Sequence, residues 1–170
     1  MKWVRYESDG KTFYGIITGD SVREVYGTPF DAYTESETIH SYENIHLLPP
    51  VIPPTFYAAG VNYETHVREA AALLGREPNI PNQADIGYRA VNAIIGHDDP
   101  IIIPSDATEK VQYEGELVVV IGKEAKHLTE ENALDCVLGY TIGNDVSERS
   151  WQASDRTLWR AKNTDTFKPM

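Results

Sequence analysis

Two glutamates stand two residues apart at the start of the apolar segment "YEGELVVVIG", residues 113–122. The run of valine, leucine and isoleucine predicts a strand, in which side chains i and i+2 leave the same face roughly 6–7 Å apart. Apolar residues on both faces predict that the strand is covered on both sides. Glu114 and Glu116 are therefore expected at the mouth of a buried region, where two like charges need a cation between them.

A third acid, Asp145, follows the run "GYTIGN", which predicts the end of the next strand. If the two strands are neighbours, three carboxylates meet at one place. Carboxylate oxygens are the ligands that Mg²⁺, Mn²⁺ and Ca²⁺ prefer, and three of them leave coordination positions open for water and substrate. The pattern predicts a divalent-metal site on Glu114, Glu116 and Asp145. The alternative is a strand end with solvated acids.

A second group with possible chemistry lies on a predicted helix over residues 62–75, with Asn62 as N-cap and Gly75 as stop. Its core-facing stripe has the i, i+3, i+4, i+7 spacing and consists of Val67, Ala70, Ala71 and Leu74. His66 and Glu69 are three residues apart and lie off this stripe, on one flank of the helix. A carboxylate beside an imidazole suits a general base that activates water. The alternative is an ordinary surface ion pair.

The remaining elements indicate an α+β fold, because their order is mixed rather than a regular βαβ alternation. Short alternating segments separated by Asp9-Gly10 and Gly19-Asp20 predict an antiparallel meander at the beginning of the chain. A proline-rich segment then favours a stiff connection and a domain boundary after residue 50. A second helix is expected over residues 129–138, ending at Gly139, and a polar helix around residues 147–156.

Composition excludes several classes of protein. The 170 residues include 26 acidic and 15 basic side chains, for a formal net charge of −11, which argues against nucleic acid or an anionic membrane as partner. The single cysteine, Cys136, permits no intramolecular disulfide and reads as a core residue in a reducing compartment. The absence of a secretory h-region or bilayer-length apolar run predicts a soluble, cytoplasmic protein. An anionic substrate needs local cations, and the candidates near the end of the sequence are Arg149, Arg156, Arg160 and Lys162.

Three segments, in this order, resemble the fumarylacetoacetate hydrolase family: "GVNYETHVREA", "YEGELVVVIGKEAKHLTEENALDCVLGYTIGNDVSERSWQ" and "RAKNTDTFKPM". The first 50 residues also resemble the small N-terminal domain of many bacterial members. The resemblance implies a small β-rich domain over residues 1–50 and a catalytic domain of mixed β-roll type over residues 51–170. Family sequences continue past "DTFKPM", so we expect an incomplete roll and a fragment of a longer protein.

The resemblance also implies a role for individual residues and a magnesium- or manganese-dependent active site. The metal triad falls on the same three carboxylates, and the helix at residues 62–75 belongs to a lid that orders over substrate. Catalytic roles fall on His66, Glu69 and Lys162, and substrate-side roles fall on Arg149 and Gln152.

The activity implied is that of an enzyme on small 2-oxo acids, in which the metal stabilises an enolate. The first expectation is a hydrolase that cleaves carbon–carbon bonds in 2,4-dioxo acids such as acylpyruvates or fumarylacetoacetate, with His66 and Glu69 activating water. One alternative is an isomerase or decarboxylase of 2-hydroxymuconate-type diacids, and another is a non-catalytic metal-binding module. The resemblance further implies a homodimer and a place in aromatic catabolism.

Overall fold

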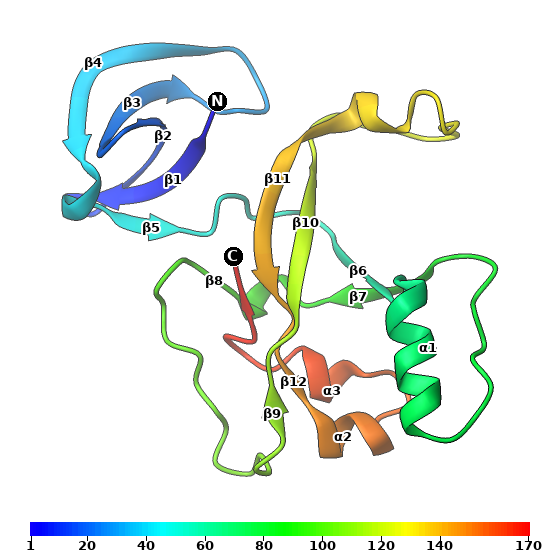
Figure 1. Ribbon diagram of the computed structural model, residues 1–170. Coiled ribbons are helices and arrows are strands. Elements are labelled where there is room, and N and C mark those ends of the chain that lie inside the picture. The colour runs from blue at the N-terminus through cyan, green and yellow to red at the C-terminus, as the bar shows by residue number, and fades with distance from the viewer. The chain divides into compact units, whose positions relative to one another are not determined.

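The computed structural model describes all residues from 1 to 170 and consists mainly of β-strands, with three short α-helices (Figure 1). The chain divides into two compact units, residues 1–52 with 92–170 and residues 53–91. This mixture of sheet and helix agrees with the α+β class predicted from the sequence. The longest helix, α1, has ten residues, and none of the helices combines the length and hydropathy needed to cross a bilayer.

The first part of the chain forms a five-stranded sheet in the order β4-β3-β2-β1-β5. Its strands are β1 (Trp3–Ser8), β2 (Lys11–Thr18), β3 (Ser21–Gly27), β4 (Tyr33–Ser41) and β5 (His46–Leu48), with the 3₁₀ turn η1 (Tyr42–Asn44) before β5. The β1–β2 turn at Asp9-Gly10 has φ of 50° and 71°, the left-handed region that such a tight turn needs. One face buries Tyr6 and Val22 completely, so this sheet has its own apolar core.

In the unit of residues 53–91, β6 (Phe56–Gly60) pairs antiparallel with β7 (Asp85–Arg89), and α1 (Glu64–Leu73) lies between them in the chain. Val67 and Ala71 are buried, as the stripe predicts, but Leu74 falls past the last helical residue and is exposed. The N-cap is Tyr63 rather than Asn62, and its side chain makes no capping hydrogen bond. Gly75 ends the helix with a φ of 61°, which a residue without Cβ adopts at little cost.

The strands that carry the acidic residues are β10 (Gly115–Ile121) and β11 (Val137–Asn144), which pair antiparallel. The helix expected over residues 129–138 is wrong. Only a 3₁₀ turn, η3 (Ala133–Cys136), forms there, and β11 begins at Val137. Hydrogen bonding of residues 137–144 to β10 outweighs the local helical pattern, because intrinsic helix propensity is a weak preference that tertiary pairing overrides.

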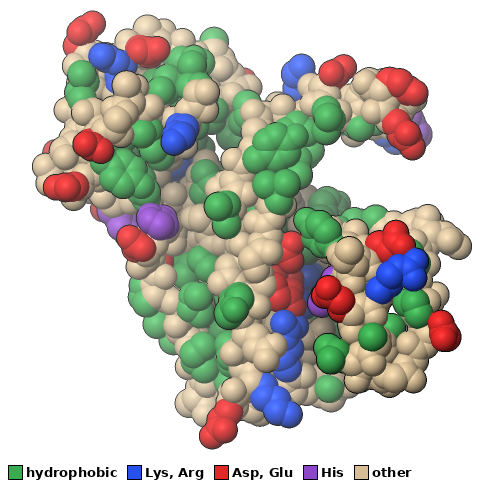
Figure 2. Space-filling model, in the orientation of Figure 1, with side chains coloured by type: hydrophobic (Ala, Val, Ile, Leu, Met, Phe, Trp, Pro, Cys, Tyr) green, Lys and Arg blue, Asp and Glu red, His purple; other side chains and the backbone are tan.

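The expectation that β10 is covered on both faces is also wrong. Alternate residues Glu116, Val118 and Val120 are half-buried, whereas the residues between them point outward and are exposed. Figure 2 shows hydrophobic side chains at the surface along this strand pair. The exposed apolar side chains of the pair are Leu117, Val119, Ile121, Leu138, Tyr140 and Ile142. One face of the strand pair is thus half-buried, and the opposite face is exposed.

Several short strands and helices complete the structure next to the ends of β10 and β11 that carry the acidic residues (Figure 1). The strand β8 (Ile94–Ile95) pairs parallel with β13 (Lys168–Pro169), and β9 (Val111–Gln112) pairs antiparallel with β12 (Ser147–Glu148). The helices α2 (Arg149–Ser154) and α3 (Trp159–Lys162) follow β12, and the 3₁₀ turn η2 (Val91–Ala93) precedes β8. Phe167 and Ala161 are fully buried. These elements fix the positions of the lysines described below.

Candidate metal centre

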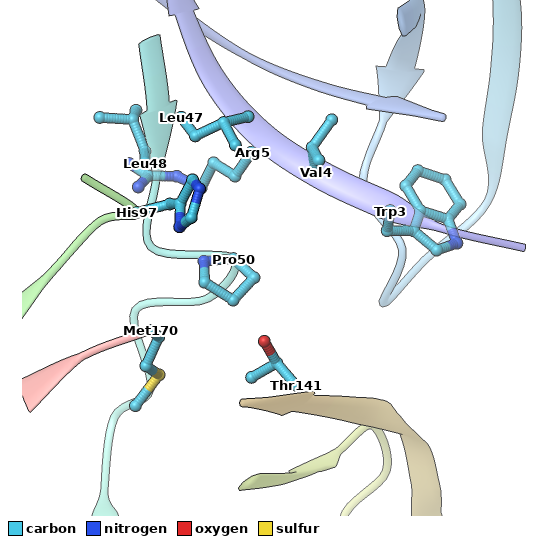
Figure 3. A pocket seen from close by; sticks show the side chains of 9 residues that line it. All are labelled: Trp3, Val4, Arg5, Leu47, Leu48, Pro50, His97, Thr141 and Met170. Atoms are coloured by element: carbon cyan, nitrogen blue, oxygen red, sulfur yellow. The ribbon is translucent and has the colours of Figure 1, made fainter. Parts of the chain in front are cut away.

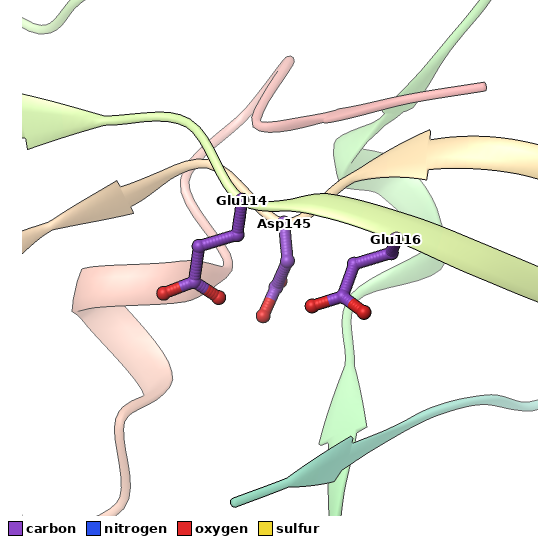
Figure 4. Close-up of side chains that lie close together, drawn as sticks. All are labelled: Glu114, Glu116 and Asp145. Carbon is purple, nitrogen blue, oxygen red and sulfur yellow. The ribbon is translucent and has the colours of Figure 1, made fainter. Parts of the chain in front are cut away.

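The three predicted carboxylates lie together where β10 begins and β11 ends. Asp145 donates its backbone N–H to the carbonyl of Glu114 at 2.8 Å, so strand pairing continues one residue past β11 and sets these two residues opposite each other. Glu116 lies on the same face, two residues further along β10. One carboxylate oxygen from each of the three lies within 4.8 Å of the others. Figure 4 shows all three pointing to the same side, with Asp145 between the two glutamates.

This donor set fits a hard divalent cation. All three groups are carboxylates, Asp145 is buried, and both glutamates are half-buried. An octahedral Mg²⁺ site has oxygen ligands at about 2.1 Å, which places them roughly 3 to 4 Å from one another. Small side-chain rotations would bring the observed spacing into that range. The absence of thiolate or imidazole in the group disfavours a zinc site of the usual kind.

Lys162, the predicted catalytic lysine, lies directly against the carboxylates. Its side chain is 6% exposed, and Nζ donates to Glu114 Oε2 at 2.7 Å, to Asp145 Oδ2 at 2.8 Å and to the Ser147 hydroxyl at 2.8 Å. An ammonium group has three protons, and each of them has an acceptor here. Lys162 therefore links two of the three predicted metal ligands.

Lys168 is a second buried lysine at the site, and it was not among the site residues predicted from the sequence. Its side chain is 2% exposed, and Nζ lies 2.9 Å from Asp145 Oδ1. The same nitrogen donates to the backbone carbonyls of Val146 and Phe167 at 3.1 and 2.9 Å. The one signal in the sequence is a lysine between Phe167 and Pro169 in a short apolar segment, where a charged side chain needs a partner if it is buried.

Arg149 and Gln152, the predicted substrate-side residues, contact each other and the first carboxylate. Arg149 Nη1 donates to Glu114 Oε1 at 2.5 Å and to Gln152 Oε1 at 2.8 Å, while Nε donates to Gln112 at 2.9 Å. The arginine is half-buried. The structure thus brings together Arg149, Gln152, Lys162 and the triad, within one unit of the chain.

Glu148 holds the start of α2, and through it Arg149, in place. It is fully buried at the N-cap of the helix, where it accepts hydrogen bonds from the Thr108 hydroxyl and, at 2.5 Å, from the Trp151 backbone N–H. Burial by itself raises the pKa of the Glu148 carboxyl, but the hydrogen bonds from Thr108, Trp151 and Ser150 outweigh it and lower the pKa below its ordinary value. Glu148 is thus ionised at neutral pH.

His66 and Glu69 lie on α1, and both side chains are exposed. The ion pair that this helix forms joins Arg68 to Glu64 at 2.6 Å, with i,i+4 spacing. The helix α1 belongs to the unit of residues 53–91, whereas the three carboxylates belong to the other unit. The catalytic role of His66 and Glu69 stays a prediction.

A small pocket of about 150 Å³ lies away from the carboxylates (Figure 3). Most of its lining is apolar, and its polar side chains are Arg5, His97 and Thr141. The lining residues are Trp3, Val4, Arg5, Leu47, Leu48, Pro50, His97, Thr141 and Met170. None of them is acidic, so the pocket offers no set of carboxylate ligands for a metal.

Comparison with known proteins connects the geometry with a family. The family described as "Fumarylacetoacetate (FAA) hydrolase C-terminal" matches residues 55–170, and the one described as "Rv2993c-like, N-terminal" matches residues 1–50. The first match covers all the candidate site residues.

Relatives with named activities include an enzyme from Xenopus laevis, "Oxaloacetate tautomerase fahd2, mitochondrial", which is 38% identical over 84% of this chain and 44% of its own length. A "Caffeoylpyruvate hydrolase" from Neonothopanus nambi is 42% identical over 58% of this chain and 33% of its own length. The crystal structure of a 5-carboxymethyl-2-hydroxymuconate delta-isomerase from Mycobacterium smegmatis superposes with a TM-score of 0.85 and 34% identity, covering 99% of this chain and 64% of that one. The chain spans between 33% and 64% of the length of these relatives.

Proposed function

Because the chain belongs to the fumarylacetoacetate hydrolase family, we propose that it carries the metal-binding part of an enzyme acting on small 2-oxo acids. The reaction we place first is hydrolysis of a carbon–carbon bond in a 2,4-dioxo acid such as an acylpyruvate. The observation that supports it most is the convergence of Glu114, Glu116 and Asp145, with Lys162 bridging two of them.

The three carboxylates are the residues that would hold a divalent cation, Mg²⁺ first and Mn²⁺ or Ca²⁺ as alternatives. Such an ion supplies a Lewis acid that binds the oxo-acid end of the substrate and stabilises negative charge on its oxygen. The donor chemistry of the site supports this assignment, since hard cations prefer carboxylate oxygens.

The cations beside the triad have a separate task, which is to bind an anionic substrate. The formal charge of −11 repels a carboxylate from the protein as a whole, so attraction has to be local. Arg149 and Gln152 present a planar donor group and an amide side by side, a pairing suited to a carboxylate. Lys162 carries protons within reach of the triad and is the residue we assign to proton donation.

Hydrolysis further requires a base that activates water. We assign this role to His66 with Glu69, on the chemistry of the pair and on the family resemblance. The exposed position of both side chains on α1 suits a segment that orders over substrate only when substrate is bound, as the lid role requires.

Tautomerisation, isomerisation or decarboxylation of a related diacid is the second candidate. Two of the relatives, a tautomerase and a delta-isomerase by name, favour it. These reactions share the enolate with the hydrolysis but need proton transfer in place of an attacking water. Lys162 alone could serve a proton transfer of this kind, whereas His66 and Glu69 would be dispensable.

Activity measurements with defined substrates distinguish these candidates. The chain is incubated with MgCl₂ or MnCl₂ and an acylpyruvate, enol-oxaloacetate or a hydroxymuconate-type diacid, and products are identified by NMR. Glu116→Ala should abolish the metal-dependent turnover, and Glu124→Ala, an exposed glutamate beyond the same strand, should not. Metal-dependent turnover that persists in Glu116→Ala would sink the proposed site.

A third candidate, a metal-binding module without catalysis, makes a different prediction. Calorimetry with MgCl₂ and oxalate would then show binding while no 2-oxo acid is turned over. Turnover of any of the substrates above excludes it.

We propose four further properties, of which the cytoplasmic location rests on composition and the other three rest on the family resemblance. They are a division into an N-terminal domain of residues 1–50 and a β-roll domain from residue 51, a homodimer, a cytoplasmic location and a place in aromatic catabolism. The separate matches to residues 1–50 and 55–170 support the division. Sedimentation analysis tests the dimer directly.

A further inference from the structure

Two buried lysines lie on opposite oxygens of the same aspartate. Lys162 Nζ is 2.8 Å from Asp145 Oδ2, and Lys168 Nζ is 2.9 Å from Asp145 Oδ1. Both ammonium groups and the carboxylate are at least 94% buried as side chains. The two lysines are alike in charge and burial, so any difference in their roles has to come from their other contacts.

Those contacts differ in kind. Lys162 bonds to side chains, namely two carboxylates and the Ser147 hydroxyl, all of which can rotate. Lys168 bonds to the backbone carbonyls of Val146 and Phe167, whose positions are fixed by the chain. The β13–β8 pairing fixes the backbone of Lys168 as well. The Phe167 carbonyl also accepts the backbone N–H of Val146 at 3.2 Å, so movement of Lys168 away from Asp145 breaks two hydrogen bonds to the buried backbone, including the one to the Val146 carbonyl. Breaking these hydrogen bonds costs free energy.

The charges of the cluster sum to zero before any metal is considered. The acids Glu114, Glu116 and Asp145 give −3, and the cations Lys162, Lys168 and Arg149 give +3. A buried charge without a partner is strongly destabilising, so this balance favours a folded chain in the absence of metal. A cation beside a metal ligand also repels an incoming Mg²⁺, which weakens the affinity for the ion.

We propose that Lys168 is a fixed counter-charge for Asp145 that keeps the metal centre folded without metal and, as a consequence, weakens metal binding. It acts through Asp145, so it is a positioning residue rather than a catalytic one. The proposal rests on the metal site proposed above.

The test removes the charge of Lys168 and measures folding and metal affinity, neither of which requires turnover. In EDTA, Lys168→Met should lower the melting temperature, and MgCl₂ should then raise it by roughly 3 °C more than it raises that of the unmodified chain. Calorimetric titration should show Mg²⁺ binding to the variant about fivefold more tightly or better. Lys123→Met, at an exposed lysine, is the matched control and should change neither quantity. Unchanged or weaker Mg²⁺ binding in Lys168→Met would overturn the proposal.

A double variant separates lost charge from lost hydrogen bonds. In EDTA, Asp145→Asn should lower the melting temperature of the unmodified chain but raise that of Lys168→Met, because the pair of changes restores a neutral cluster (−2 and +2). If Lys168→Met does not fold alone, folding of the double variant supports the proposal, and failure of both to fold overturns it. Equal lowering by Asp145→Asn in both backgrounds also overturns it.

The same measurements distinguish this inference from the proposed function. If the unmodified chain does not bind Mg²⁺, or if Glu116→Ala binds it equally well, the metal site fails, and with it the part of the proposal that concerns affinity. In EDTA, the change in melting temperature caused by Asp145→Asn should differ in sign between the unmodified chain and Lys168→Met. This comparison tests the role of Lys168 as a counter-charge without any metal.

Discussion

The cluster around Asp145 and the helix α1 both carry residues assigned to catalysis, but the chain holds them in opposite ways. Asp145 and its two lysines are buried and joined by contacts from several elements. His66 and Glu69 stand on the exposed side of α1, where an ion pair joins Glu64 to Arg68 on the next turn. The buried charges around Asp145 contribute to folding, whereas the exposed side chains on α1 can be replaced with little effect on folding. A residue that moves with a lid is expected to have such an exposed side chain, because mobile segments contribute little to the stability of the fold.

The largest effect is expected at the centre of the cluster. Asp145→Ala leaves two buried ammonium groups without their shared partner, and we expect a loss of about 3–5 kcal/mol in the free energy of unfolding. Urea titration followed by tryptophan fluorescence measures it. Asp98→Ala, at a side chain that is 89% exposed, is the control, and a comparable loss in both variants would mean that burial makes no difference.

A smaller effect is expected at Glu148, which is held by hydrogen bonds rather than by cations. Glu148→Gln replaces one of the two acceptor oxygens with an NH₂ donor, which then faces the Thr108 hydroxyl or the Trp151 backbone N–H, and we expect a loss of about 1–3 kcal/mol in the free energy of unfolding at neutral pH. The pKa of Glu148 is lowered in the folded state, so the folded chain binds fewer protons than the unfolded chain in acid, and stability rises with pH there.

The unmodified chain should therefore exceed Glu148→Gln in unfolding free energy by the full amount above the ordinary carboxyl pKa of about 4.3. This difference should shrink as the pH falls below that value. Unfolding titrations at several pH values between neutrality and acid check this. An advantage that grows in acid would contradict the sign of the pKa shift.

Arg149 is half-buried, so its exposure is intermediate between that of Asp145 and that of His66 and Glu69. Its substitution should have an intermediate effect on the free energy of unfolding. Arg149→Lys keeps the charge but loses the planar group that contacts Gln112, Glu114 and Gln152 together. We expect a change in unfolding free energy of about 1 kcal/mol or less and a rise in KM of about tenfold, with a smaller change in kcat. An unchanged KM for the 2-oxo acid in Arg149→Lys would exclude a role of Arg149 in substrate binding.

The smallest effect on folding is expected on α1. His66→Ala and Glu69→Gln should each change the unfolding free energy by less than about 0.5 kcal/mol, because both side chains are exposed. If the pair activates water, kcat for acylpyruvate hydrolysis falls by about 100-fold or more in the same variants. Arg68→Ala on the same helix is the control. Full activity in both variants would support a surface pair and favour the tautomerase alternative.

Local signals in the sequence predicted a good part of the fold. The turn dipeptide Asp9-Gly10, the stripe with Val67 and Ala71, and the strand predicted within residues 113–122 all depend on neighbours in the chain. The meeting of Asp145 with the two glutamates required only that successive strands pair, which is the commonest arrangement.

Features that depend on distant parts of the chain could not be predicted in this way. The apolar residues before Gly139 fit a helix as well as a strand, and pairing with β10 decides between them. The burial of Lys168 depends on parallel pairing with residues 94–95, more than 70 positions earlier. The apolar neighbours Phe167 and Pro169 are the one local signal for this lysine, and they do not identify the carboxylate that it contacts.

The uncovered apolar face of β10 and β11 also bears on the colloidal behaviour of the chain. Leu117, Tyr140 and Ile142 form a water-facing patch on strands whose outer edges can accept further strands. Like-charge repulsion from a net charge of −11 keeps copies of the chain apart in dilute buffer. Added salt shortens the range of that repulsion while leaving apolar attraction intact. The chain should therefore stay dispersed at low ionic strength, and its solutions should become turbid at high ionic strength.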